Sequence, residues 1–178
     1  MFKYLVPNDA GIAKEVFRLA YPVIVSNLSR VLMSVFDVAM VGRLGPAALA
    51  ATGMGGMMFW GALSLTLGIR TAVQTVSSRR LGQKLDKQSG TAFHNGIYMA
   101  TAYGVPVSLL GWAFVDSVVP FFVKDVHATP LAIEYTSVVF LSLAFSAYSF
   151  VFQGFYTGVE KTKIHMTVTI TSNVINLY

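Results

Sequence analysis

Three long stretches of this sequence contain no Asp, Glu, Lys, Arg or His. They run from Pro46 to Ile69, from Asn95 to Val115 and from Tyr135 to Val159, and they are 24, 21 and 25 residues long. At about 1.5 Å of rise per residue, a helix of any of these lengths crosses the roughly 30 Å hydrocarbon core of a bilayer. A buried helix of a water-soluble protein rarely needs that length. The stretches therefore predict membrane-spanning helices.

The composition agrees, because only 12% of the residues are charged whereas soluble domains carry about 25%. A further span is predicted from about Val16 to Val41, although Arg18, Arg30 and Asp37 interrupt it. The residues before it lack the compact apolar core and cleavage site of a signal peptide, so we expect this helix to be retained. The chain has no cysteine, which excludes disulfides and thiolate metal sites.

We expect an all-α bundle of helices joined by short connections, with the helices over about 14–41, 47–80, 91–123, 131–158 and 164–178. Gly42–Pro46 and Lys124–Pro130 are the predicted outer connections, and Leu81–Gly90 and Glu160–Lys163 the inner ones. The last helix has 15 residues, or about 22 Å, which is too short to cross. We therefore expect four complete helices and the start of a fifth, in a polypeptide that continues; a natural end is the alternative.

The basic residues follow the topology of a membrane protein. Of 13 Lys and Arg residues, nine fall in the predicted inner segments, two in the outer connections and two, Arg30 and Arg70, within spans. This bias predicts a cytoplasmic N-terminus. Nucleic-acid binding is disfavoured despite the net charge of +5, because no polar domain displays a basic face. The inner residues are Lys3, Lys14, Arg18, Arg79, Arg80, Lys84, Lys87, Lys161 and Lys163.

Asp37 is the sharpest functional candidate, because an ionisable side chain within a span is costly. It lies in the outer half of the first predicted helix among apolar neighbours. Protonated it is neutral, and deprotonated it can hold Na⁺ or a cationic ligand, which is what a cation-coupled exchanger needs. The alternative is an aspartate at the membrane edge, solvated by an outer vestibule.

Other polar side chains occur within the spans. Arg30 lies seven residues before Asp37 on the same face, about 10 Å away along the helix, and should face the protein interior or a cavity. Asn173 and Asn176 are three apart and share a face. With Asp37 they could line one polar pocket, or they could form hydrogen bonds between helices without a ligand. The same two alternatives apply to Gln153.

Pro22 predicts a weakened point low in the first helix, where bending could accompany a titration of Asp37. Met33 and Met57 belong to a group of methionines whose flexible thioethers suit a cavity for varied apolar ligands, although packing or lipid contact is the more common role of such residues. No motif places a nucleophile beside a base, so an enzyme is disfavoured. Metal ligation is not indicated by the three histidines, which fall at helix ends without ligand spacing: His94, His127 and His165.

Several blocks of the sequence resemble the MATE (multidrug and toxic compound extrusion) transporters. The first helix and turn supply Leu19-Ala20-Tyr21-Pro22, Asp37, Met40-Val41-Gly42-Arg43-Leu44-Gly45-Pro46 and Ala48-Leu49-Ala50-Ala51. These are similar to the family pattern LALP…VDTxMVGRLGPxALAA. Further agreement comes from Thr71–Thr75 with Arg79–Gly82, and from Gln153–Gly158 with Lys161–Lys163. Asn173-Val174-Ile175-Asn176 resembles the start of the family's fifth-helix pattern, especially in the prokaryotic DinF-like branch.

The resemblance implies twelve helices in two six-helix lobes related by pseudo-twofold symmetry, and drug efflux coupled to H⁺ or Na⁺ without another cofactor. The chain would be an incomplete N-terminal lobe in the inner membrane, and inactive without the C-terminal lobe. Its substrates would be amphipathic, often cationic, organic compounds. Asp37 matches the family's first-helix acidic residue, Asn176 its fifth-helix asparagine, and Pro22 the proline linked to helix bending.

Arg30 departs from the uncharged residue usual in the family, which puts the charge of the cavity in question. Two alternatives stay open. One is a flippase for lipid-linked precursors within the same superfamily, and the other is a membrane scaffold that transports nothing.

Overall fold

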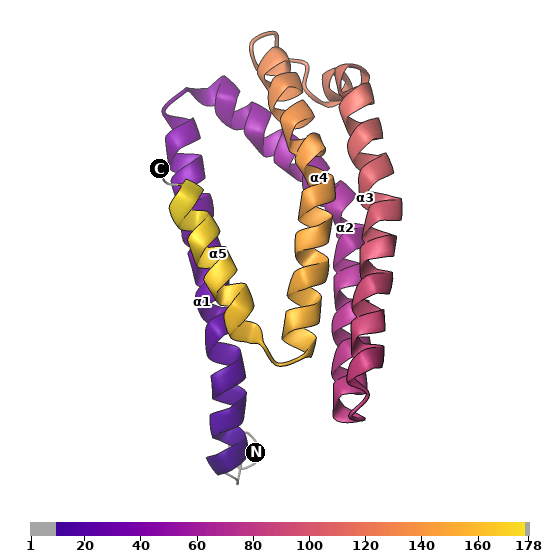
Figure 1. Ribbon diagram of the computed structural model, residues 1–178. Helices are drawn as coiled ribbons and strands as arrows, with labels where there is room; N and C mark the ends of the chain where they lie inside the picture. The colour runs from indigo at the N-terminus through magenta and orange to yellow at the C-terminus, as the bar shows by residue number, and fades with distance from the viewer. Residues whose placement is uncertain (1–9, 177–178) are drawn as a thin grey trace, which may run out of the picture.

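The computed structural model describes residues 10–176, with side chains over 11–175, and consists there of helices without strands (Figure 1). The helices are α1 (Ala10–Gly42), α2 (Pro46–Gly82), α3 (Asp86–Phe122), α4 (Ala128–Gly158) and α5 (Thr162–Asn176). The predicted all-α bundle is confirmed. Four helices, α1 to α4, are long and apolar enough to cross a membrane.

The connection between α1 and α2 shows why the sequence turns where it does. Gly45 has a φ of 106°, a conformation that side chains with a Cβ rarely adopt. Pro46 follows as the first residue of α2, where its missing N–H costs no hydrogen bond. The amide of Leu49 already bonds to the Gly45 carbonyl at 3.2 Å. The predicted turn at Gly42–Pro46 is therefore present.

The predicted loops at Leu81–Gly90 and Lys124–Pro130 are too long. α3 begins at Asp86, so the polar residues after it form the first turn of a helix, and the Asp86 carboxylate lies where the helix dipole favours negative charge. α4 begins at Ala128 because Asp125 caps it. The Asp125 carboxylate accepts hydrogen bonds from the backbone amides of His127 at 2.9 Å and Ala128 at 2.8 Å.

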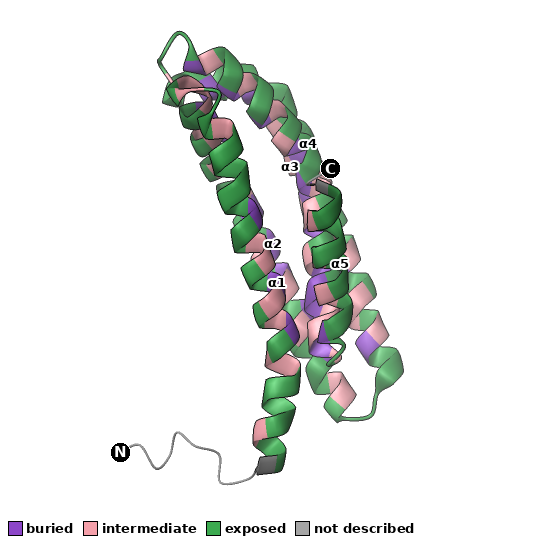
Figure 2. Cartoon of the chain, turned by 90° about the vertical axis from the view of Figure 1, so that its left-hand side faces the viewer, coloured by how far each residue is buried: buried purple, intermediate pink, exposed green. Residues whose placement is uncertain are grey.

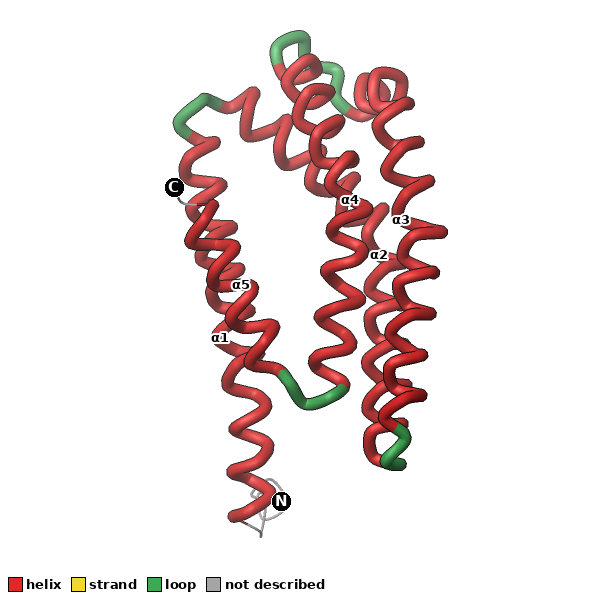
Figure 3. Tube along the Cα trace, in the orientation of Figure 1, coloured by secondary structure: helices red, strands yellow, loops and turns green. Residues whose placement is uncertain are grey.

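The helices pack as two groups. α2, α3 and α4 form a three-helix bundle, in which the contact of α2 with α4 is the most extensive, whereas α1 packs mainly along α5. Figures 1 and 3 show α1 and α5 side by side, apart from most of the bundle. Within the bundle the backbones approach closely through small residues. A Cβ added to Gly154 of α4, for example, would lie 2.4 Å from the Arg70 carbonyl oxygen of α2.

Buried residues face the contacts between helices (Figure 2), and many of the exposed residues are large and apolar. Leu63, Leu143 and Val119 are almost completely buried, whereas Phe121 is 76% exposed and Phe145 73% exposed. A water-soluble protein rarely leaves so many large apolar side chains uncovered. Together with the four long helices, this surface supports the prediction of membrane spans.

Candidate functional site

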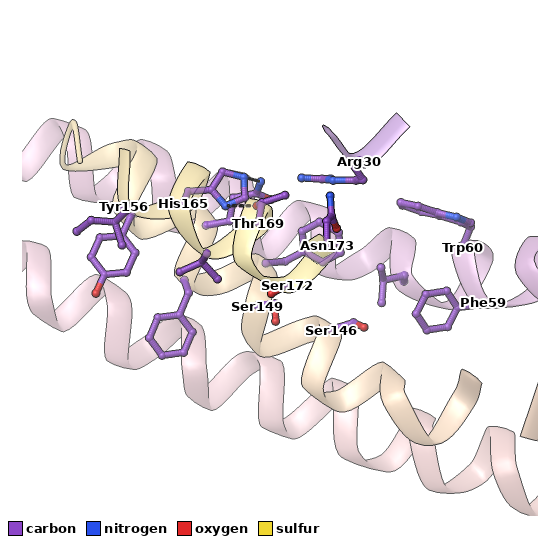
Figure 4. A pocket seen from close by; sticks show the side chains of 16 residues that line it. Arg30, Phe59, Trp60, Ser146, Ser149, Tyr156, His165, Thr169, Ser172 and Asn173 are labelled. Carbon is purple, nitrogen blue, oxygen red and sulfur yellow. Dashed lines mark hydrogen bonds between the residues drawn. The ribbon is translucent and has the colours of Figure 1, made fainter. Parts of the chain in front are cut away.

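A cavity of about 650 Å³ lies where α1 and α5 meet α2 and α4. Its volume is that of a pocket for a drug-sized molecule. Figure 4 shows the side chains that converge on it. The lining residues come from α1 (Arg30), α2 (Phe59, Trp60, Leu63), α4 (Ser146, Ser149, Phe150, Phe152, Gln153, Tyr156) and α5 (Ile164, His165, Val168, Thr169, Ser172, Asn173).

Asn173 joins α5 to α1 at the wall of this cavity. Its side-chain Nδ2 donates a hydrogen bond of 2.8 Å to Ser29 Oγ. The neighbouring residue of α1, Arg30, is half-buried and also lines the cavity. The Asn173 amide therefore both bonds between helices and borders a cavity, although Asp37 does not line that cavity.

Gln153 and His165 form a second polar group between α4 and α5. Gln153 is only 6% exposed, and its Nε2 lies within hydrogen-bonding distance of His165 Nε2. His165 Nδ1 lies 3.4 Å from Thr169 Oγ1. The contacts with Gln153 and Thr169 thus hold the imidazole of His165 in the cavity wall.

His165 was missed as a site residue in the sequence, where it was considered only as a metal ligand. Its spacing could have revealed it, since His165, Thr169 and Asn173 are four residues apart and so share one face of the helix. Among the described residues, no group of three His, Asp or Glu side chains could hold a metal ion.

The charge that faces the cavity is positive. None of the lining residues is acidic, and Arg30 is the one that always carries charge. Arg70 lies nearby, with its guanidinium carbon 5.8 Å from the centroid of the Phe150 ring, and it is close enough to Arg30 for the two charges to repel each other. The ion pair between Arg18 and Glu15, at 3.5 Å, is the only salt bridge among the described residues.

Asp37 lies outside the lining of the cavity. Its side chain is exposed, about two helical turns along α1 from Arg30, and it interacts electrostatically with Tyr135 of α4. Asn176 ends α5, and its side chain falls outside the described residues. The structure thus brings Arg30, Gln153 and Asn173 together but leaves Asp37 at a distance.

The other candidates of the first two helices also lie away from the lining. Met33 is 8% exposed and so serves packing, whereas Met57 is 75% exposed. Pro22 is almost completely buried, and its carbonyl accepts a 2.7 Å hydrogen bond from Ser26 Oγ. α1 continues through Pro22 without interruption.

Comparison with known proteins gives the family. Residues 22–178 match the MatE family. The chain is 25% identical over 165 residues to the "Probable multidrug resistance protein NorM" of Bacillus subtilis, covering 92% of this chain and 36% of that protein. It is 32% identical over 104 residues to the protein of the same name in Idiomarina loihiensis, covering 58% of this chain and 22% of that protein.

A solved structure of the same family has a similar fold. An outward-facing multidrug resistance MATE family transporter of the MOP superfamily superposes with a TM-score of 0.86 at 23% identity, over 92% of this chain and 36% of that chain. This chain thus spans about a third of the length of the proteins it matches. These relatives carry the name NorM, so the finer likeness to the DinF-like branch stays a prediction. With four apolar helices of spanning length and a family match over most of its residues, the chain is a multi-pass membrane protein that belongs to the MATE family of transporters.

Proposed function

We propose that this chain forms part of a cation-coupled antiporter that exports amphipathic organic compounds by alternating access. The observation that carries the proposal is the cavity at the junction of α1 and α5 with α2 and α4. It combines an aromatic wall with a few convergent polar groups, which is the usual make-up of a small-molecule site. The protein would lie in the inner membrane with its N-terminus in the cytoplasm, as the distribution of Lys and Arg favours.

Asp37 is the proposed site of H⁺ or Na⁺ coupling. It is the only acidic residue between Glu15 and Asp86, and it lies on the helix that supplies Arg30 to the cavity. A cation bound at Asp37 would change the charge of α1, and bending near Pro22 would let the helix respond. The hydrogen bond from Asn173 to Ser29 would carry that movement to α5, and Asn176 would support the cation site.

Transport would require more than these residues. The chain corresponds to 36% of the relative from Bacillus subtilis, and alternating access needs a second lobe for the first to move against. We therefore propose that the chain alone is inactive and that a C-terminal lobe is its partner.

The test is the Asp37→Asn variant of the intact polypeptide in proteoliposomes. Substrate-driven flux of H⁺ or Na⁺ should be lost, because an amide cannot exchange a proton or carry the negative charge. Asp116→Asn is the matched control, since Asp116 is likewise an exposed aspartate but lies on α3, which contributes nothing to the cavity lining. Unchanged coupling in Asp37→Asn would overturn the proposal.

A flippase of lipid-linked precursors is the second candidate, favoured by the positive charge of Arg30 and Arg70. Its ligand would carry a diphosphate and a long lipid chain. Translocation of a fluorescent lipid-linked diphosphate sugar, without efflux of soluble compounds, would favour this candidate over the antiporter.

A further inference from the structure

We propose that the cavity between α1, α2, α4 and α5 selects amphipathic anions: compounds with an apolar aromatic body and one carboxylate or other acidic group. The acidic group would bind at Arg30 and Asn173, and the aromatic body against Phe59, Trp60 and Phe150. This inference rests on the proposed function for the direction of export, but the ligand's charge follows from the cavity itself.

The first step concerns the unbalanced charge. Arg30 is always protonated and lines the cavity in the middle of α1. No acidic residue lines the same cavity, and within residues 10–176 no carboxylate forms a salt bridge with Arg30. Asp37 is about 10 Å further along the helix. Since an unpaired cation within a membrane is unfavourable, a ligand that brings the missing negative charge gains binding energy there.

The second step concerns what a cationic ligand would meet. Besides Arg30, the cavity lies close to Arg70, which acts electrostatically on both Arg30 and His165. His165 also lines the cavity, where it contacts Gln153. A ligand with an ammonium group would therefore approach two arginines and no counter-charge, and like charges in a low-dielectric site repel each other strongly.

The third step is the geometry of the donors. Figure 4 shows the guanidinium of Arg30 close to the side chain of Asn173, on the same side of the cavity. A guanidinium binds a carboxylate through two parallel N–H donors, and the Asn173 amide has a second N–H besides the one given to Ser29. Ser149 and Ser172 also line the cavity, and their hydroxyl groups can donate as well.

The fourth step is the apolar wall. Phe59, Trp60 and Leu63 of α2 line one side, and Phe150 of α4 continues it. Leu63 is 1% exposed, whereas Trp60 is 53% exposed and so free to cover a ligand. Aromatic faces stack with a flat apolar body. A volume of about 650 Å³ suits a drug-sized molecule rather than a long lipid.

The experiment compares two probes with the same pyrene body, 1-pyrenebutanoate and its trimethylammonium counterpart, bound to the intact polypeptide in zwitterionic nanodiscs. Pyrene fluorescence gives each Kd after subtraction of empty nanodiscs. We expect the carboxylate probe to bind at least about tenfold more tightly. Arg30→Gln should weaken the carboxylate probe about tenfold and remove that preference, while Arg30→Lys keeps most of it.

Two further variants separate the contribution of the probe's charged group from that of its pyrene body. Trp60→Ala should weaken both probes by the same factor, since it removes the shared contact with the pyrene body. Arg43→Gln, in the exposed turn before α2, should change neither. Tighter binding of the ammonium probe, an unchanged preference in Arg30→Gln, or binding of neither probe would overturn the inference.

The failure of this inference is distinguishable from that of the proposed function. Coupled transport that is lost in Asp37→Asn, together with equal binding of the two probes, would leave the antiporter intact and remove the anion preference. If the protein translocates a lipid diphosphate but does not bind the pyrene carboxylate, its arginines bind a lipid headgroup. That outcome would likewise contradict the inference.

Discussion

The side-chain amide of Asn173 donates a hydrogen bond of 2.8 Å to the hydroxyl of Ser29, across 144 residues of sequence. The bond joins the fifth helix to the first beside the cavity that Arg30 lines. α1 touches α2 only slightly, so its pairing with α5 is what positions Arg30 against the rest of the cavity wall.

Removing either partner of this bond should loosen α1 from α5. We expect Asn173→Ala and Ser29→Ala each to destabilise the protein by about 0.6 kcal/mol, and by less than about 1.7 kcal/mol, which is the range for such bonds within membranes. The double variant should cost less than the sum of the two single ones. Thermal unfolding in detergent measures this, and purely additive losses would mean that the bond contributes nothing.

Gly154→Ala should separate α4 from α2. The new Cβ would lie 2.4 Å from the backbone oxygen of Arg70, and because backbone cannot rotate away, the helices must move apart. We expect a loss of about 1–3 kcal/mol in stability. Gly68→Ala is the matched control within α2, where a Cβ meets nothing within 4 Å. It should leave stability unchanged or raise it by up to about 1 kcal/mol, and an equal loss in both variants would contradict the close-contact argument.

The cap of α4 should give the protein a pH-dependent stability. The backbone amides of Ala128 and His127 hold the pKa of the Asp125 carboxyl below its ordinary value of 3.8. A lowered folded pKa means that the stabilisation is complete above the unfolded pKa and is lost as the pH falls through the folded one. We expect Asp125→Ala to lower the Tm by a few degrees at pH 7, with a smaller difference from the wild type below about pH 4.

Asp125→Asn is the control for charge, since asparagine caps helices nearly as well but does not titrate in this range. Its Tm should stay near that of the wild type at pH 7. A difference between Asp125→Ala and wild type that is constant from pH 7 to pH 3 would show that the carboxylate charge plays no part in the cap.

Gln153→Leu should leave the His165 imidazole without its donor in the cavity wall. We expect a loss of up to about 1 kcal/mol, because His165 is only partly buried and its ring loses the net value of one hydrogen bond. Adding His165→Phe should recover part of that loss, since both polar groups are then gone. A double variant less stable than Gln153→Leu would argue that the contact between the two side chains is not a stabilising hydrogen bond.

Local properties of the sequence were sufficient to predict the helices themselves. Charge-free stretches of spanning length predicted α2, α3 and α4, because the thickness of a bilayer fixes how many apolar residues a helix needs. Gly45 and Pro46 predicted the turn before α2, since few other residues accept those backbone angles. The starts of α3 and α4 were placed too late, because Asp86 and Asp125 resemble loop residues in sequence although they begin and cap helices.

The cavity could be anticipated only in part. Gln153, Asn173 and Arg30 were identified because polar groups within spans are costly and so need partners or a function. His165 lies near the start of α5 and was considered only as a metal ligand, so its place in the cavity was not predicted. Met57 looked equally suited to a cavity, yet its side chain is exposed.

By itself the sequence determined that the chain crosses a membrane with apolar helices, where those helices turn, and which family it resembles. The tertiary structure alone decided that α1 pairs with α5, that Arg30 rather than Asp37 faces the cavity, and that Gln153 meets His165. The physical reason is that lipid accepts apolar side chains as readily as a protein interior does. The hydrophobic pattern of a membrane helix therefore does not show which face is buried, and only contacts between distant helices settle it.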